Sequence, residues 1–485
     1  MSLQVYNTLT RQKEPFVPLH EGHVGIYVCG PTVYSDAHLG HAKSYVSFDV
    51  IVRYLRFLGY KVRYVQNITD VGHLTDNADA GEDKILKRAR LERLEPMEIA
   101  ERYTRSYFED MDALNVVRPD ISPRASGHIP EMLELIERLI AKGHAYEVNG
   151  SVYFSVDSFP QYGRLSGRRV EDQEEGARVE INPEKRNPAD FALWKRAEAG
   201  HILRWRSPWG YGYPGWHIEC SVMSTKYLGQ PFDIHGGGRD NQFPHHESEI
   251  AQSEAAYDQP FARYWLHNNM VTVNGVKMSK SLGNYMTLKE AFTRYAPLVV
   301  RFFVLSTHYR SPVDFSEPAL EAAAKGLERL HGAVKLARDA LARAGAPAGE
   351  ADPAVTQALD EHRRRFIEAM DDDFNTAIAL SVLFDLARVT NTWLNAGVSL
   401  SSASLAAIDA TYRALAGDVL GLLPARFGGA EGADLTGRLV ELLIEMRQEA
   451  RKAKDFARAD LIRSRLADLG VVLEDGVEGT RWRLR

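Results

Sequence analysis

The sequence predicts an α/β fold with a parallel sheet, a helical region after it and a small unit at the C-terminus. Near the N-terminus, strand, helix and strand patterns follow one another within about 40 residues, which predicts the sheet. From about residue 316 to about residue 423, Ala, Leu, Arg and Glu recur at helical spacing, interrupted by the linker-like GAPAGEADP. A second loose stretch, ARFGGAEGAD, separates the last unit from the rest.

The composition is that of a soluble globular protein. The 485 residues suffice for two to four domains, because single cores stop growing at ~250–300 residues. The N-terminus lacks the apolar core of a signal peptide, and no run approaches the ~18 apolar residues of a membrane span. Two cysteines cannot build a disulfide framework, so we expect a cytoplasmic protein with reduced thiols and no membrane contact. With a net charge of -6, a nucleic-acid surface must be a local basic patch.

The strand–helix–strand unit lies at residues 24–69. VGIYVCG is short, apolar and closed by Gly30 and Pro31, which predicts a buried strand. HAKSYVSFDVIVRYLRFLG has apolar residues at helical spacing and stops at Gly59. KVRYVQNIT predicts the second strand. In such a unit the strands are parallel, and ligands bind beyond their carboxyl ends.

The middle of the chain mixes loop and strand signals. NPADFALWKR and SPWGYGYPGWHIECSVM are rich in Trp, Gly and Pro, which predicts ordered loops that form a site. PFDIHGGG and YWLHNNMVTVNG read as strands, and PHHESEIAQSEAAY predicts a helix with Pro244 in its first turn.

The two cysteines occupy positions that core packing explains poorly. Cys29 ends the first predicted strand, and Cys220 lies in GWHIEC. In PHHESE, His245 and Glu249 are four residues apart and share one helix face. All four residue types bind zinc, although the scattered positions lack CxxC spacing. The alternative is that the cysteines are small buried apolar residues and the histidines cap a helix.

Two further motifs point to a nucleotide. His38 and His41, in HLGH, open a helix directly after a strand and loop, where backbone N–H groups and the helix dipole favour phosphate. Alone, HLGH could be a metal-binding pair or a capped surface helix. KMSKS, with Lys277 and Lys280, would alone be a solvated loop. Together the two motifs predict two basic groups around one triphosphate.

The pair of HLGH and KMSKS resembles the class I aminoacyl-tRNA synthetases. Longer segments resemble the bacterial cysteinyl-tRNA synthetases, and the resemblance spans nearly the whole chain: YVCGPTVYSDAHLGHA, RYLRFLGYKVRYVQNITD, RNPADFALWK, PGWHIECSVMS, FDIHGGGRDNQFPHHESEIAQSE, EAMDDDFNTAIA and VVLEDGVEGTRWR. It implies a Rossmann-like parallel-sheet catalytic domain with an inserted connective domain, followed by an α-helical bundle and a small C-terminal anticodon-binding domain. The implied bounds are 1–118 and 208–276 for the catalytic domain, 119–207 for the insertion, 277–315 for the KMSKS loop and stem-contact region, 316–425 for the bundle and 436–485 for the last domain.

The resemblance also implies a reaction. L-Cysteine and ATP would form cysteinyl-adenylate, and the cysteinyl group would pass to the 3′ end of tRNA(Cys). One zinc ion per chain would be held by Cys29, Cys220, His245 and Glu249 and would bind the substrate thiolate. Serine would compete poorly for zinc, so an editing domain is not needed. We expect Mg²⁺ with ATP, and a monomer.

Other residues match family positions. His38, His41 and Lys280 would serve ATP, with Lys277 secondary. The cysteine pocket would be lined by Thr32, Thr69, Trp216, His217 and Asp240. Asp240 is a candidate partner for the substrate ammonium; Trp216 is a candidate apolar wall, although core packing also explains it.

The C-terminal unit carries a basic segment. From Arg447 to Arg465 there are seven basic and three acidic residues, a net charge of +4. This excess suits contact with phosphates, although a solvated amphipathic helix has the same composition. The resemblance implies that anticodon bases are read by Arg451, Asp460 and Asp475, with Trp482 as a stacking candidate.

Two departures and two rival functions remain. In the family pattern HIGH stands where this sequence has HLGH. After NITD this sequence has the additional segment VGHLTDNADAGE at 71–82, which contains His73 and is a polar loop or a second metal site. One rival is a ligase that joins cysteine to a glucosamine–inositol, which needs no anticodon-binding unit. The other is a non-catalytic RNA-binding relative, which would not need HLGH, KMSKS and the four candidate ligands.

Overall fold

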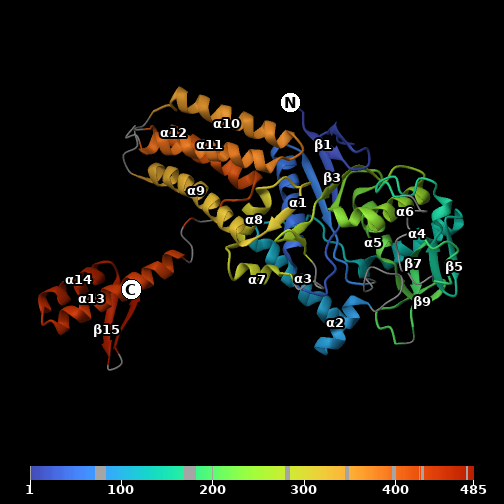
Figure 1. Ribbon diagram of the computed structural model, residues 1–485, viewed down its shortest axis with the longest axis horizontal. Helices are drawn as coiled ribbons and strands as arrows, with labels where there is room; N and C mark the ends of the chain where they lie inside the picture. The colour runs from blue at the N-terminus through green and yellow to red at the C-terminus, as the bar shows by residue number, and fades with distance from the viewer. Residues whose placement is uncertain are drawn as a thin grey trace. The chain divides into compact units, whose positions relative to one another are not determined.

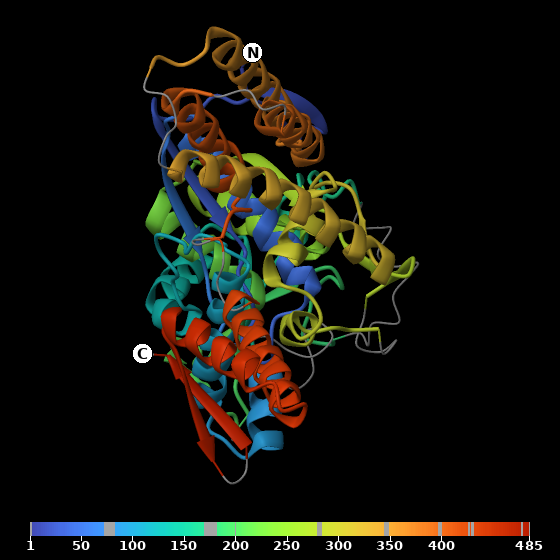
Figure 2. The ribbon, with the colours of Figure 1, turned by 90° about the vertical axis from the view of Figure 1, so that its left-hand side faces the viewer.

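The computed structural model describes residues 2–71, 83–168, 182–198, 200–278, 284–343, 349–395, 400–424, 427, 431–476 and 479–484. They form two compact units, Met1–Leu423 and Pro424–Arg485, drawn in Figures 1 and 2. Each unit has its own buried core.

A four-stranded parallel sheet is the centre of the first unit. Its order is β11-β10-β3-β4, with β3 (His23–Val28), β4 (Lys61–Gln66), β10 (Phe232–Gly238) and β11 (Ala262–Asn268). The predicted strand–helix–strand unit is confirmed, because α1 (Leu39–Phe57) connects β3 to β4. Gly59 follows α1 with a φ of 93°, a left-handed conformation that ends helices.

Helices cover both faces of this sheet. In Figure 1, α1 lies on one side of β3, and α5 (Trp216–Leu228) and α6 (Glu247–Tyr257) lie on the other. The sheet side of α1 is buried, which excludes water from the apolar residues of both layers. Gly236 in β10 allows this close approach, since a Cβ there would lie 2.3 Å from Cε1 of Phe48.

An antiparallel sheet is inserted between β4 and α5. Its order is β5-β6-β7-β9-β8: β5 (Ala145–Val148), β6 (Ser151–Phe154), β7 (Phe191–Arg196), β8 (Trp205–Ser207) and β9 (Gly210–Pro214). Helices α2 (Lys84–Glu92), α3 (Pro96–Ala113) and α4 (Ile129–Ala141) precede it. The prediction of loops at 187–196 and 207–223 is therefore wrong, because these segments form β7, β8, β9 and the start of α5. Trp194 is fully buried and Tyr213 nearly so, whereas Tyr211 is 52% exposed.

The rest of the first unit surrounds this core. The hairpin β1 (Gln4–Asn7) and β2 (Gln12–Pro15) begins the chain, and β12 (Val271–Val273), β13 (Val276–Lys277) and β14 (Val313–Phe315) form a small sheet. Helices α7 (Leu288–Phe292) and α8 (Pro297–Leu305) lead into the predicted bundle, formed by α9 (Glu317–Ala342), α10 (Pro353–Asp371), α11 (Thr376–Asn395) and α12 (Ser402–Tyr412). By length and composition alone α11 could cross a membrane, but it packs against α9 and α10.

The second unit contains two helices and a hairpin. These are α13 (Glu431–Lys452), α14 (Phe456–Asp468), β15 (Val471–Gly476) and β16 (Gly479–Leu484). Its core consists of Val440, Ile444, Leu466, Val471 and Leu473.

Candidate active site

A cleft of about 380 Å³ opens where the parallel strands end. It lies beyond the carboxyl ends of β3, β4, β10 and β11 and beside the N-terminus of α1, where ligands of parallel α/β sheets bind. Most of the predicted site residues line it: Cys29, Thr32, His38, His41, Thr69, Trp216, Cys220, Asp240 and His245.

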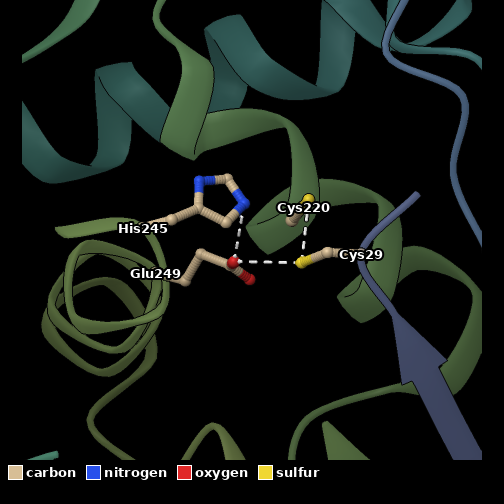
Figure 3. A group of neighbouring side chains, drawn as sticks. All are labelled: Cys29, Cys220, His245 and Glu249. Atoms are coloured by element: carbon tan, nitrogen blue, oxygen red, sulfur yellow. Dashed lines mark hydrogen bonds and ion pairs between the residues drawn. The ribbon is translucent and has the colours of Figure 1, made fainter. Parts of the chain in front are cut away.

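The four candidate metal ligands converge beside this cleft, which Cys29, Cys220 and His245 line and Glu249 does not. Figure 3 shows Cys29, Cys220, His245 and Glu249 pointing toward one another. The two sulfurs are 3.8 Å apart, and the Cys29 sulfur lies 3.7 Å from Oε1 of Glu249. Nε2 of His245 lies 3.1 Å from the same oxygen. One donor atom from each residue lies within 4.8 Å of the other three, and all four residues are buried.

The fold places each of these side chains. Cys29 follows β3, where its N–H donates to the carbonyl of Gly236 at 3.0 Å. Cys220 lies in the second turn of α5, and Glu249 in the first turn of α6. The helix predicted to start at Pro244 is confirmed: a helical turn at Gln242–His246, kinked at Phe243, runs directly into α6 at Glu247. His245, in that turn, still faces Glu249.

The donor set fits a divalent cation such as zinc. Ligands at ~2.0–2.3 Å from a tetrahedral ion lie roughly 3.3–3.8 Å from one another. The separations of 3.1, 3.7 and 3.8 Å between the donor atoms are close to that spacing. Burial raises the pKa of Cys29, Cys220 and Glu249, so the site favours protonated groups until a cation stabilises their charged forms.

Two histidines that the sequence analysis did not select contact this cluster. Nε2 of His235 lies 2.7 Å from Oε2 of Glu249, and Nε2 of His246 lies 3.2 Å from the sulfur of Cys29. With Cys29 and Glu249 they form a second possible ligand group, but neither histidine lines the cleft. Burial lowers the pKa of His235 to about 3, so its ring is neutral. His246 follows His245 in the sequence, which was an available signal; His235 stands out only as a polar residue in an apolar strand.

The HLGH histidines lie where they were predicted, at the start of α1. His38 is the N-cap: its N–H donates to Nδ1 of His41 at 3.1 Å, and the N–H of Gly40 donates to Nδ1 of His38 at 3.0 Å. In a neutral ring whose Nδ1 accepts, Nε2 carries the proton, so both rings can donate Nε2–H. Met278 also lines the cleft, whereas Lys280 and the Lys277 side chain lie outside the described residues.

The predicted cysteine-pocket residues lie around the four ligands. Thr32 and Thr69 pair as a bridge between chain extensions of β3 and β4, and the Thr69 hydroxyl lies 2.8 Å from Oε2 of Glu219. The Trp216 ring stacks on His245 with centroids 4.2 Å apart. His217 contacts His245, Nδ1 to Nδ1, at 2.9 Å but does not line the cleft.

The predicted anticodon residues lie in the second unit. Arg451 and Asp460 are exposed on α13 and α14. Trp482 is half-buried and packs on the core of that unit, while Asp475 pairs with Thr480 in the hairpin. Of the inserted segment 71–82, residues 72–82, including His73, lie outside the described residues.

The fold is shared with solved synthetases of other specificities. The Mycobacterium tuberculosis methionyl-tRNA synthetase bound to methionyl-adenylate matches 82% of this chain and 89% of its own, with a TM-score of 0.57 and 17% identity. The Agrobacterium radiobacter LeuRS–tRNA–LeuAMS complex matches 84% and 85%, with a TM-score of 0.59 and 13% identity. Residues 15–325 match the tRNA synthetases class I (C) catalytic domain. Fold, cleft and HLGH together define a class I aminoacyl-tRNA synthetase.

The matches of the other domains, and relatives of higher sequence identity, indicate which synthetase family the chain belongs to. Residues 365–424 match the DALR domain, and residues 434–483 match the cysteinyl-tRNA ligase anticodon binding domain. Cysteine–tRNA ligase of Thermus thermophilus is 56% identical over 486 residues and 100% of both chains, and that of Chlorobium luteolum is 55% identical over 488 residues and 99% of both. The chain belongs to the cysteine–tRNA ligase family.

Proposed function

We propose that this chain activates L-cysteine with ATP and transfers it to tRNA(Cys), and that a zinc ion held by Cys29, Cys220, His245 and Glu249 selects cysteine. The aminoacylation is supported by the full-length similarity to cysteine–tRNA ligases. The selection by zinc rests on one observation: two thiols and an imidazole that line the cleft converge with a buried carboxylate.

The site would separate cysteine from serine by metal chemistry. A zinc ion in this position would bind a thiolate far better than a hydroxyl group. The small size difference between the two amino acids gives a purely apolar pocket little to discriminate. Thr32, Thr69 and Trp216 would close the pocket around the substrate, and Asp240 at its rim would attract the substrate ammonium.

Adenylate formation needs positioning more than a protein nucleophile. The cysteine carboxylate attacks the α-phosphate of ATP, and pyrophosphate leaves, with ATP entering as its Mg²⁺ complex. His38 and His41 would donate Nε2–H to phosphate oxygens beside the N-terminus of α1, and Lys280 and Lys277 would add positive charge. The second unit would hold the anticodon arm of the tRNA, with Arg451, Asp460, Asp475 and Trp482 as candidate contacts.

The test is transfer of labelled cysteine to total tRNA, with excess serine as competitor. Acid-precipitable cysteine that serine does not reduce is the expected result. Strong inhibition by serine would contradict selection by zinc. Cysteine-dependent pyrophosphate exchange without charging would instead indicate the ligase for a small amine acceptor.

A further inference from the structure

A buried cluster of one aspartate and two arginines lies away from the cleft. The Asp49 cluster consists of Asp49 and Arg53 in α1 and Arg301 in α8. Asp49 and Arg301 are fully buried and form an ion pair, and Nε of Arg53 lies 2.8 Å from Oδ2 of Asp49. Buried ion pairs add little net stability, because desolvation offsets their attraction. A role in positioning explains the cluster better.

The two guanidiniums hold the carbonyl oxygens of two segments that end helices. The 114–115 segment follows α3, and the 418–421 segment comprises the last two residues of the short helix Arg413–Val419 and the two residues after it. Arg301 donates to carbonyls of both segments, at 3.0 Å to residues 114 and 115 and at 2.7 Å to residue 420. Arg53 also donates to both, at 2.7 Å to residue 115 and 3.2 Å to residue 418. Carbonyls at helix ends lack partners in their own helix, so a forked guanidinium can serve several at once.

The fit around the 418–421 segment is close. Gly421 has a φ of 62°, and a Cβ at this residue would lie 2.5 Å from Nη2 of Arg301. The side chain of Asn115 donates Nδ2–H to the Gly421 carbonyl at 2.8 Å. The segment is therefore held by the Asp49 cluster and by the 114–115 segment together.

The segment that the Asp49 cluster holds is close in sequence to the start of the second unit, and two residues of the cluster share a helix with residues of the cleft. The second unit begins at Pro424, three residues after Gly421. Asp49 lies at the middle of helix α1, which has His41 in its first turn and His38 as its N-cap, beside the cleft. At 1.5 Å per residue, the eight residues from His41 to Asp49 span about 12 Å. Helix α1 therefore carries both a residue that holds the 418–421 segment and a histidine that lines the cleft.

We propose that Asp49, Arg53 and Arg301 are positioning residues for the tRNA-dependent step, because they fix the point at which the second unit is attached to the catalytic core. This inference rests on the proposed function, in which the second unit holds tRNA. A fixed attachment point raises the effective concentration of the tRNA 3′ end at the cleft. Adenylate formation needs no tRNA and does not depend on this attachment.

The experiment compares two reactions of the full chain with zinc bound. Cysteine-dependent pyrophosphate exchange and charging of tRNA are measured for Arg53→Lys and Arg301→Lys. Lysine keeps the charge, but its single ammonium cannot serve the same set of acceptors. The control is Arg56→Lys, in the same helix, whose guanidinium bonds to Asp120 and not to the 418–421 segment. Arg53→Lys keeps the test valid if Arg301→Lys fails to fold, since the Arg53 side chain is partly exposed.

We expect exchange within about twofold of the unaltered chain and a roughly tenfold loss of kcat/KM for tRNA in charging, mostly in KM. The control keeps both reactions. A parallel fall of exchange and charging, together with a lower Tm, would reduce the cluster to a structural role and overturn the inference. Unchanged charging in Arg53→Lys would also overturn it. Failure of the unaltered chain to charge tRNA would refute the proposed function itself.

Discussion

Cys29 directly follows strand β3, and its sulfur lies 3.8 Å from that of Cys220 and 3.7 Å from Oε1 of Glu249. Removing a side chain that only hydrogen-bonds to a metal ligand typically lowers the metal affinity 10–100-fold. Removing a ligand itself should lower the affinity at least as much. We expect Cys29→Ser to lose bound zinc and cysteine activation together. Metal analysis and pyrophosphate exchange measure the two effects, with the buried Ser224→Ala on α5 as control. Full zinc occupancy in Cys29→Ser would rule out the four-ligand site.

Lys43 carries a buried charge that the site does not use. It is 1% exposed, its Nζ lies 3.4 Å from the carbonyl of His308, and burial lowers its pKa from 10.5 to about 8. Below pH 8 the Lys43 amine is protonated in both the folded and the unfolded chain. Burial of this charge then lowers the free energy of unfolding by about 3 kcal/mol, because a difference of one in pKa corresponds to ~1.36 kcal/mol. Between pH 8 and 10.5 only the unfolded chain keeps the proton, so stability rises with pH.

Replacing Lys43 by methionine should remove this cost. We expect Lys43→Met to raise the Tm at pH 7, and to raise it much less at pH 10, where the folded chain has already released the proton. The exposed Lys61→Met should leave the Tm nearly unchanged at both pH values. An equal gain at pH 7 and pH 10 would mean that the buried charge is not the cause.

At the scale of elements, the site depends on how closely β3 and β4 approach at their carboxyl ends. A Cβ on Gly30 would lie 1.6 Å from the carbonyl oxygen of Asn67, and the Gly30 N–H donates to the Asn67 side chain at 2.8 Å. We expect Gly30→Ala to separate the strand ends, displace Cys29 and lower zinc content and cysteine activation. Gly332→Ala in α9, with open space at its Cβ, is the matched control. Normal zinc content in Gly30→Ala would show that the strand ends can adjust.

Elements with a clear period were predictable from the sequence, and those defined by distant packing were not. The apolar spacing in α1 and the stop at Gly59 predicted a helix that the structure confirms. Helix α5 was predicted as a loop because its buried face includes Glu219, Ser221 and Ser224, so no apolar stripe marks it. The contact between His235 and Glu249 depends on the packing of α6 against β10, which local sequence does not reveal.

At the scale of the molecule, the two units divide the chemistry. Every described residue that lines the cleft belongs to Met1–Leu423, whereas the predicted anticodon residues belong to Pro424–Arg485. Each unit has its own core, so the first unit should fold without the second.

Removal of the second unit therefore separates activation from charging. We expect a chain ending at Leu423 to keep cysteine-dependent pyrophosphate exchange within a few fold, because its cleft and four candidate ligands are intact. Charging of tRNA should fall by about 100-fold or more, since one of two linked binding sites is lost and linkage commonly adds 10²–10⁴-fold. Both reactions are measured at equal zinc content. If exchange is lost while the truncated chain stays folded and zinc-bound, the second unit must act on the cleft itself, and the division of labour argued for the two units is wrong.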